Sequence, residues 1–147
     1  MKITEPAIVV EASFKISKKE LWDIITGIDH MHKWFFDSIP SFEPVEGFET
    51  SFSLSSGDRE FDHRWKIIEV DPGTKIVYDW CYTGYQGRGT VSFELAELEM
   101  STQLKLVNKT TEDWQEGIPE FNRESAESGW NYFITQSLKS YIDDLYS

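Results

Sequence analysis

The first patterned segment of the chain alternates between apolar and polar side chains. Between residues 7 and 16 every second residue is apolar, and Glu11, Ser13 and Lys15 occupy positions between them. A period of two is typical of a strand that buries one face and exposes the other to water. The chain is therefore predicted to begin with a half-buried strand.

Two short helices are expected after this strand. Ser17 and Glu20 have the spacing of a capping box, in which each side chain satisfies the backbone N–H of the other residue. The apolar residues that follow recur at helical spacing over residues 18–26. Asp29 is placed to cap a second helix over residues 30–36, because its carboxylate can accept hydrogen bonds from the free N–H groups of a first turn.

Beyond the helices, the pattern is that of strands separated by turn residues. We expect six strands here: Ser41–Val45, Glu49–Ser55, Phe61–Val70, Lys75–Tyr82, Gly89–Ala96 and Thr102–Asn108. The breaks between them are short and rich in Gly, Pro, Asp and Ser, which favour tight turns. Consecutive strands joined by short turns pair antiparallel, so a meander is predicted.

The hairpin between the third and fourth of these strands has a testable register. A loop at residues 71–74 places Trp65 opposite Trp80. The same register places Lys66 opposite Asp79 on the other face, where we expect an ion pair. A slip by one residue would separate both pairs, so this register is preferred.

A helical pattern closes the chain. Apolar residues from Glu120 to Leu145 form one stripe at helical spacing. At about 1.5 Å per residue such a helix is roughly 40 Å long, enough to cross a whole sheet. Gly129 lies inside this predicted helix, where glycine destabilises the helix by about 1 kcal/mol relative to alanine. Two explanations stay open: the glycine keeps a cavity open beneath the helix, or it lets the helix pack closely on the sheet.

The composition is that of a soluble globular protein with an excess of aromatic residues. The chain has 147 residues, of which 39% are hydrophobic and 27% are charged. This length is typical of one domain, so we expect a single domain over residues 1–147. Phe, Trp and Tyr make up 15% of the chain, and so many large rings need a large core or a cavity to line.

The charge and the cysteine content argue against several classes of partner. The formal net charge is −12, which repels nucleic-acid phosphates and anionic membrane surfaces. No apolar run approaches the roughly 20 residues of a membrane span, and no signal-peptide pattern precedes the first strand. The single cysteine, Cys81, cannot form an internal disulfide. We therefore expect a cytoplasmic protein that binds neither nucleic acid nor membrane.

Several short motifs follow one another along the chain. They are the helix start Ser17-Lys18-Lys19-Glu20-Leu21-Trp22, then Trp34, then Ile68-Glu69-Val70-Asp71-Pro72 before Ile76-Val77-Tyr78-Asp79-Trp80, then Thr102-Gln103-Leu104-Lys105-Leu106, and finally Gly129-Trp130 with Leu138 and Tyr141 behind it. In this order they resemble the START-like (SRPBCC, helix-grip) superfamily, and within it the C-terminal-domain type of the family named after the activator of heat-shock protein 90 ATPase. One departure is that only Gly47 stands where that family often has a Gly-Gly pair.

The resemblance implies an α+β helix-grip fold. A curved antiparallel β-sheet of about six to seven strands wraps round a long C-terminal helix, with two short helices after the first strand. A cavity between the sheet and this helix is also implied. In the superfamily the cavity binds apolar or amphipathic small molecules, and a few branches host cyclase or aldolase-type chemistry there. The eukaryotic namesake domain binds a chaperone.

Residues on the inward-facing stripes are the candidate cavity residues. They are Trp34, His63, Trp65, Tyr78, Trp80, Phe93, Trp130 and Phe133. A small-molecule site is mostly apolar, with a few polar groups that orient the ligand. The alternative is that these rings form a plain core. His63 shares strand parity with Trp65, so we expect it on the same face, either as a hydrogen-bonding site residue or as a satisfied histidine at the sheet rim.

These features favour a binding module for an apolar or amphipathic small molecule, with no catalytic residue, cofactor or metal. His30 and His32 are two residues apart and do not face each other on a helix, so no metal site is expected. One alternative is an enzyme of the cyclase, dehydratase or hydrolase type that uses His63 or Asp79 as acid or base in the same cavity. The other alternative, which follows from the resemblance, is an interaction domain with a chaperone ATPase as its partner.

Overall fold

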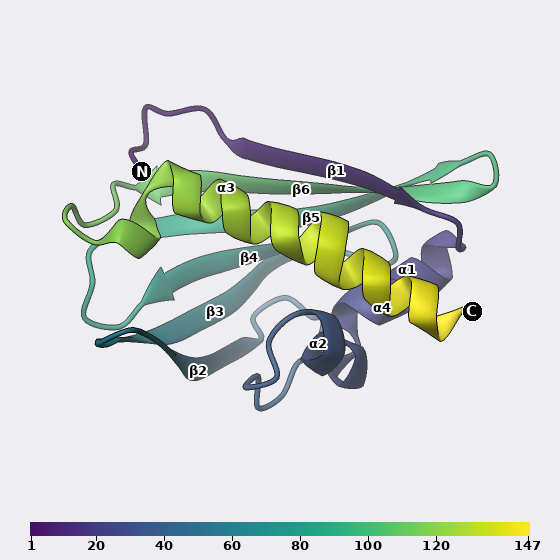
Figure 1. The fold of residues 1–147 in the computed structure, drawn as a ribbon, viewed down its shortest axis with the longest axis horizontal. Helices are drawn as coiled ribbons and strands as arrows, with labels where there is room; N and C mark the ends of the chain where they lie inside the picture. The colour runs from purple at the N-terminus through teal and green to yellow at the C-terminus, as the bar shows by residue number, and fades with distance from the viewer.

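A six-stranded antiparallel sheet carries a long helix across one of its faces (Figure 1). The computed structural model describes residues 1–147. Its elements in chain order are β1 (Ile8–Phe14), α1 (Lys18–Thr26), α2 (Ile28–Trp34), β2 (Glu49–Ser56), β3 (Arg59–Asp71), β4 (Lys75–Tyr82), β5 (Arg88–Leu98), β6 (Ser101–Glu112), η1 (Pro119–Phe121), α3 (Arg123–Asn131), η2 (Tyr132–Ser137) and α4 (Leu138–Leu145). Figure 1 shows α1 and α2 near the end of the sheet that the C-terminus approaches.

The sheet has the order β1-β6-β5-β4-β3-β2, and every neighbouring pair is antiparallel. Strands β2 to β6 form a meander, and β1 adds to its far edge beside β6. Along β3 the buried residues are Phe61, His63, Trp65 and Ile67, and the residues between them are more exposed. We call the face that these buried side chains occupy, under the long helix, the inner face. The predicted α+β helix-grip fold is confirmed.

The first helix forms where its capping pattern predicts. Ser17 Oγ accepts a hydrogen bond from the Glu20 amide, and the Glu20 carboxylate accepts one from the Ser17 amide. The second helix begins at Ile28, two residues before the predicted start. Gly27 is its N-cap and also the C-cap of α1, so the two helices share one joint. Asp29 is therefore in the first turn, where its negative charge suits the positive end of the helix dipole.

The predicted strand at Ser41–Val45 is wrong. These residues have no strand pairing, and the chain there leads from α2 to β2. Pro40 and Pro44 lie on either side of Phe42 and lack the N–H groups that a strand needs. Phe42 still reaches the core, where its ring stacks on Tyr78 at 5.7 Å between ring centroids. The apolar residue Phe42 therefore indicated burial of one ring and not a strand.

The register of the β3–β4 hairpin is confirmed over its central residues. Trp65 pairs with Trp80, and Lys66 lies opposite Asp79. The expected ion pair between Lys66 and Asp79 is wrong, because Asp79 pairs instead with Arg88 of the next strand. A β-bulge at Ile68 shifts the register by one residue toward the turn. Bulges add a residue to one strand and increase its local twist.

The closing helix begins later than predicted and is not uniformly α-helical. Glu120 lies in the short η1 turn, and α3 starts at Arg123 with the Asn122 side chain accepting from the Ser125 amide. The residues of η2 are wound as a π-helix. The buried residues Trp130, Ile134, Leu138 and Ile142 are each four apart. In a regular α-helix a step of four residues rotates by about 40° more than a full turn, so side chains four apart gradually leave the face that packs on the sheet. The wider turn of the π-helix offsets this rotation, and the four buried side chains therefore stay on the face that contacts the sheet.

The core is dominated by aromatic rings, and its centre is closed. Phe35, directly after α2, has its ring centroid 4.6 Å from that of Trp34, 5.5 Å from that of Trp65 and 5.0 Å from that of Phe133. The middle of the space between sheet and helix is therefore filled by side chains. No helix of the chain combines the length and apolar character needed to cross a membrane.

Candidate functional site

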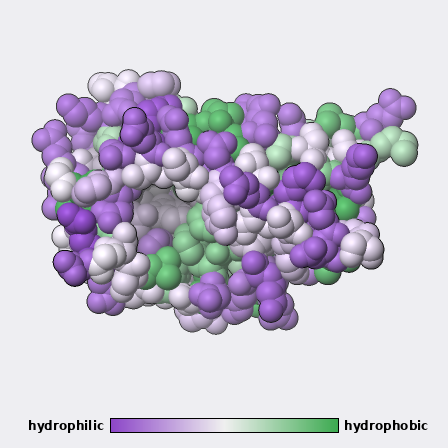
Figure 2. Space-filling view, viewed as in Figure 1, coloured by the Kyte–Doolittle hydropathy of each residue, from purple (hydrophilic) through white to green (hydrophobic).

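A cavity remains at one end of the interface between the sheet and the long helix, beneath the start of α3. Its volume is about 180 Å³, and 10 of its 15 lining residues are hydrophobic. Figure 2 shows the corresponding hollow in the molecular surface, between α3 and the strands β3 and β4 as they lie in Figure 1. We call this space the α3 cavity.

Three parts of the chain form the walls of the α3 cavity. The sheet contributes His63, Trp80, Tyr82, Val91 and Asn108. The helix contributes Ser125, Ala126, Gly129, Trp130 and Phe133. The remaining wall comes from Met1, Phe36, Trp114, Glu120 and Phe121. The cavity is thus assembled from segments that are far apart in the sequence.

The eight predicted cavity residues fall into two groups. His63, Trp80, Trp130 and Phe133 line the α3 cavity. Trp34, Trp65, Tyr78 and Phe93 lie in the packed core, where each is at most 2% exposed. Phe35 separates the second group from open space because its ring occupies the centre of the interface.

Phe36 forms the inner end of the cavity, and the sequence analysis did not identify it as a site residue. Its ring centroid lies 5.5 Å from that of His63 and 5.1 Å from that of Phe133. The helix α2 ends at Trp34, and Phe35 leaves the helical conformation with φ −112° and ψ −105°. The available signal was the run of three aromatic residues, Trp34-Phe35-Phe36, at the end of the predicted helix. Where the helix ends, the chain changes direction and directs the rings of Phe35 and Phe36 into the interface between sheet and helix.

Trp114 forms another wall, and Gly87 makes room for it. A Cβ on Gly87 would lie 2.5 Å from Trp114 Cε3, and Gly87 has φ +121°, which also favours glycine. Gly89 is required for another reason, because a Cβ there would lie 2.9 Å from the Lys109 carbonyl oxygen, whereas its distance of 3.5 Å from Trp114 Cζ2 is ordinary van der Waals contact. The available signal for Trp114 was the glycine-rich segment 84–89 between β4 and β5, because a residue without Cβ allows a large ring to approach the backbone closely.

Gly129 faces open space. A Cβ built on this residue meets no heavy atom within 4 Å, and Gly129 lines the cavity. The explanation by close packing of helix on sheet is therefore wrong. The missing side chain leaves room at the helix side of the cavity.

His63 presents one free nitrogen to this region. The residue is 7% exposed, and its Nδ1–H donates to the Phe61 carbonyl at 3.1 Å. Burial lowers the pKa of His63 to about 4, although the Phe61 hydrogen bond and Asp62 act in the opposite direction. The imidazole is therefore neutral at neutral pH, and Nε2 is an acceptor without a partner in the chain.

Tyr82 lies beside His63 and offers the complementary group. The two rings meet edge to face with their centroids 4.7 Å apart. Burial raises the pKa of Tyr82 to about 12, with a smaller opposite effect from the indole of Trp80. The phenol therefore stays protonated, and its O–H finds no acceptor within the chain.

Two other polar side chains of the lining, those of Trp130 and Asn108, are already hydrogen-bonded. Trp130 Nε1–H donates to Asn108 Oδ1 at 3.2 Å, and Asn108 Nδ2 donates to the Thr90 carbonyl at 3.2 Å. These bonds tie the long helix to the sheet across the cavity. The buried indole N–H groups of Trp80 and Trp114 have no partner and lie out of reach of solvent.

Glu120 connects the cavity wall to the β2–β3 hairpin. Its carboxylate accepts from Ser56 Oγ at 2.8 Å and lies 3.5 Å from Arg59 Nη1. The Ser56 hydrogen bond, with a further contribution from Arg59, lowers the pKa of Glu120. The carboxylate is therefore ionised at neutral pH and contributes a negative charge to the lining.

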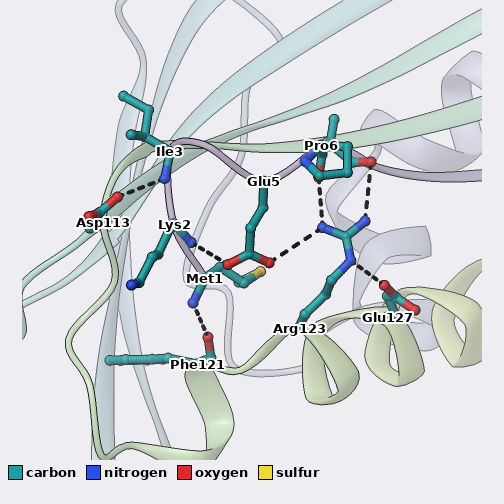
Figure 3. A network of polar contacts seen from close by, with 10 residues as sticks. Met1, Lys2, Ile3, Glu5, Pro6, Asp113, Phe121, Arg123 and Glu127 are labelled. Atoms are coloured by element: carbon teal, nitrogen blue, oxygen red, sulfur yellow. Dashed lines mark hydrogen bonds and ion pairs between the residues drawn. The ribbon is translucent and has the colours of Figure 1, made fainter.

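The N-terminal segment passes over the same end of the molecule (Figure 3). The Met1 ammonium donates to the Phe121 carbonyl at 3.1 Å, and the Ile3 amide donates to Asp113 Oδ1 at 2.7 Å. Since Met1 lines the α3 cavity, these contacts fix one part of its wall. We call residues 1–7 the N-terminal strap.

Arg123, at the start of α3, holds the strap from the other side (Figure 3). Its guanidinium donates to the Pro6 carbonyl at 2.7 Å and to the Ala7 carbonyl at 3.5 Å. It also lies 3.8 Å from a Glu5 carboxylate oxygen and 2.6 Å from one of Glu127. Arg123 therefore connects the N-terminal strap to α3, the helix that forms one wall of the α3 cavity.

The outer face of the sheet holds a separate polar cluster. Asp79 and Cys81 alternate with the inward Trp80, so they point away from the α3 cavity. Arg88 pairs with Asp79 and places Nη2 3.7 Å from Cys81 Sγ. Asp79 therefore lies on the opposite face of the sheet from His63.

The remaining histidines make separate contacts at the helices. His30 Nδ1 lies 2.6 Å from the Tyr141 hydroxyl, and His32 Nε2 donates to the Ile39 carbonyl at 2.6 Å. Each of these rings therefore has a hydrogen-bonding role between secondary-structure elements.

The antiparallel sheet, the long gripping helix and the space between them define the START-like, helix-grip class of protein. Residues 15–143 match the family described as activator of Hsp90 ATPase homolog 1-like protein. The chain belongs to this family. None of the curated proteins matches it.

Similar solved structures share this fold at low sequence identity. DynU16, a protein of the dynemicin biosynthetic locus, is 20% identical with a TM-score of 0.73, over 95% of this chain and 48% of its own. MLL2253 from Mesorhizobium loti is 21% identical with a TM-score of 0.72, over 94% and 97%. The Aha1 dimer from Colwellia psychrerythraea is 18% identical with a TM-score of 0.69, over 94% and 96%. This chain thus spans about half the length of DynU16.

Proposed function

We propose that this protein binds a small apolar or amphipathic molecule in the α3 cavity. The observation that carries the proposal is a cavity of about 180 Å³ with a mostly hydrophobic lining, beside which His63 Nε2 and the Tyr82 hydroxyl lack partners in the chain. Small-molecule sites commonly combine an apolar wall with a few polar groups that orient the ligand. The closed centre of the interface confines the ligand to this end of the fold.

The volume limits the size of the ligand. An apolar cavity of about 150 Å³ is large enough for benzene, whereas pockets for drug-sized molecules have about 300–1,000 Å³. The α3 cavity therefore suits a molecule with a single ring or a short chain. A sterol or a polycyclic product requires movement of the aromatic side chains that fill the centre.

Two-dimensional NMR titration with toluene, phenol and cyclohexanol tests the proposal. Saturable shifts are expected at the amide and indole resonances of Trp80 and Trp130, since both rings line the cavity. Gly129→Leu is expected to abolish them, because its side chain enters open space instead of displacing packed atoms. Ser128→Leu places the same side chain on an exposed position of the same helix and is the matched control.

Two results would remove the proposal. One is the absence of saturable shifts with every probe at millimolar concentration. The other is equal binding by the wild type and by Gly129→Leu, which would place the site elsewhere on the surface. Retained binding in Ser128→Leu together with loss in Gly129→Leu would support it.

No particular contact favours the alternative functions. His63 and Asp79 lie on opposite faces of the sheet, so they cannot act as acid and base on one substrate in the α3 cavity. A chaperone ATPase as partner remains a prediction from family membership. The α3 cavity supports binding of a small molecule in preference to these alternatives.

A further inference from the structure

The polar groups at the α3 cavity restrict the chemistry of the ligand as well as its size. His63 and Tyr82 both line the cavity, and their rings are in edge-to-face contact at 4.7 Å. Each retains one hydrogen-bonding group without a partner in the chain. A buried polar group that loses water without gaining a partner is costly, so these two groups favour a ligand that can satisfy them.

The two free groups have opposite hydrogen-bonding roles. The Nδ1–H of His63 is committed to the Phe61 carbonyl at 3.1 Å, which leaves Nε2 as an acceptor. The O–H of Tyr82 is a donor. The wall therefore offers one acceptor and one donor side by side.

The free polar groups argue against an anionic ligand. The charges at the cavity itself are mixed, because the Glu120 carboxylate in the lining is paired with Arg59 and the Met1 ammonium lies in the same wall. A carboxylate ligand has no proton to donate to His63 Nε2, and the formal net charge of −12 on the whole chain repels it. A ligand ammonium would have to lose most of its hydration against an apolar wall, which is costly for a charged group. A neutral hydroxyl satisfies both free groups, since it can donate and accept.

This inference rests on the proposed function. We propose that the α3 cavity selects a neutral single-ring molecule bearing a hydroxyl, a phenol or a cyclic alcohol. Its ring packs against Trp80, Trp130 and Phe133, its O–H donates to His63 Nε2, and its oxygen accepts from Tyr82 O–H.

Phenol, toluene and benzoate form a matched set of probes for this proposal. They share one ring and differ in carrying a hydroxyl, a methyl or a carboxylate. Phenol is expected to bind wild-type protein about tenfold more tightly than toluene, given the ordinary net strength of two neutral hydrogen bonds. Benzoate is expected to bind more weakly than phenol.

Two substitutions that keep an aromatic ring locate the selectivity. Tyr82→Phe and His63→Phe are each expected to reduce the preference for phenol over toluene severalfold, because each removes one free polar group and keeps an aromatic ring. Tyr85→Phe is the matched control, since Tyr85 also contacts Phe61 and Phe121 but does not line the cavity. It is expected to keep the wild-type preference.

The outcomes separate this inference from the proposed function. Equal affinity of wild-type protein for phenol and toluene, or tightest binding of benzoate, would overturn the inference and leave an apolar site in place. A preference for phenol that survives both Tyr82→Phe and His63→Phe would also overturn it. Failure of wild-type protein to bind any probe of the set would overturn the proposed function itself.

Discussion

The imidazole of His63 shows how one buried side chain couples the stability of the fold to pH. Its ring stacks on Phe52 at 4.8 Å between centroids and is 7% exposed. Burial penalises the charged form, so the pKa falls from 6.5 to about 4. The ionised groups near this pocket are the carboxylates of Asp62, next to His63 on β3, and of Glu120 in the cavity wall, together with the Arg59 guanidinium that pairs with Glu120 and the Met1 ammonium.

We predict that the protein loses stability as the pH falls from 6.5 to about 4. In this window the unfolded chain binds a proton at His63 that the folded chain does not, so the free energy of unfolding decreases with decreasing pH. The lowered pKa corresponds to about 3 kcal/mol. Urea unfolding at the two ends of the window is expected to show this loss in wild-type protein and most of it removed in His63→Gln.

His32→Gln is the control for this measurement. It removes a histidine that bonds to the Ile39 carbonyl outside the cavity, and it is expected to keep the pH dependence of the wild type. An unchanged pH dependence in His63→Gln would show that the imidazole is not the group responsible.

At the scale of elements, the end of α2 decides how much of the interface is open. The helix stops at Trp34, and the next two aromatic residues pack between the sheet and the long helix. Phe35 fills the centre, whereas Phe36 is only partly buried and forms the cavity end. Phe133, in the π-wound segment of the helix, packs against Phe36 at this end of the cavity, with 5.1 Å between the ring centroids. The cavity is therefore bounded by two local departures from regular helix geometry.

We predict that Phe36→Ala enlarges the α3 cavity toward the centre of the interface. A fully buried phenylalanine costs about 3–5 kcal/mol when truncated to alanine, so a partly buried one is expected to cost about 2 kcal/mol. The variant should bind naphthalene, which has two fused rings, whereas the wild type should not. Chemical denaturation and NMR titration measure these two effects.

Tyr132→Ala is the control for Phe36→Ala. Tyr132 is 52% exposed at the start of the π segment, so its truncation is expected to change stability by less than about 0.5 kcal/mol and to leave naphthalene excluded. If Phe36→Ala bound naphthalene no better than this control, Phe36 would not be the barrier.

At the scale of the whole molecule, the N-terminal strap and the closing helix hold each other in place. The strap lies beside the start of α3, and Arg123 bonds to two of its carbonyl groups (Figure 3). The Trp114 amide donates to the Met1 carbonyl at 2.9 Å, so the strap also fixes the segment after β6. The cavity wall at this end therefore depends on contacts between the two ends of the chain.

We predict that Arg123→Met loosens the strap without unfolding the protein. Hydrogen bonds from a charged donor contribute about 1.5–3 kcal/mol, but the guanidinium is partly exposed and its ion pairs are screened by solvent. The expected loss is about 1–2 kcal/mol, measured as about tenfold faster hydrogen exchange at the Ile3 and Trp114 amides.

Lys139→Met is the matched control for the strap. It breaks the exposed pair with Asp143 on the same helix, far along the chain from the strap. Exchange at the Ile3 and Trp114 amides should then keep the wild-type rate. Equal hydrogen-exchange rates at these two amides in Arg123→Met and Lys139→Met would show that Arg123 does not hold the strap.

Local sequence patterns predicted the helices and strands correctly where the conformation of each residue depends on its near neighbours in the chain. The capping box and apolar spacing placed α1 at Lys18–Thr26, and turn residues placed β4 at Lys75–Tyr82, both as observed. The pairing of Trp65 with Trp80 followed from strand parity. The expectation at Ser41–Val45 failed because an apolar residue near prolines signals burial, and burial does not require strand pairing.

The sequence alone determined the class of fold, the inward face of the central strand residues and the family to which the chain belongs. These depend on periodicity and on short motifs, which act over a few residues. The tertiary structure alone decided where open space remains, because a cavity depends on how rings from distant segments fill a common volume. Phe35 closes the centre, Gly129 leaves the helix side open, and Trp114 packs closely on Gly87 to complete the wall. The free nitrogen of His63 and the free hydroxyl of Tyr82 likewise emerge only once every competing partner has been placed.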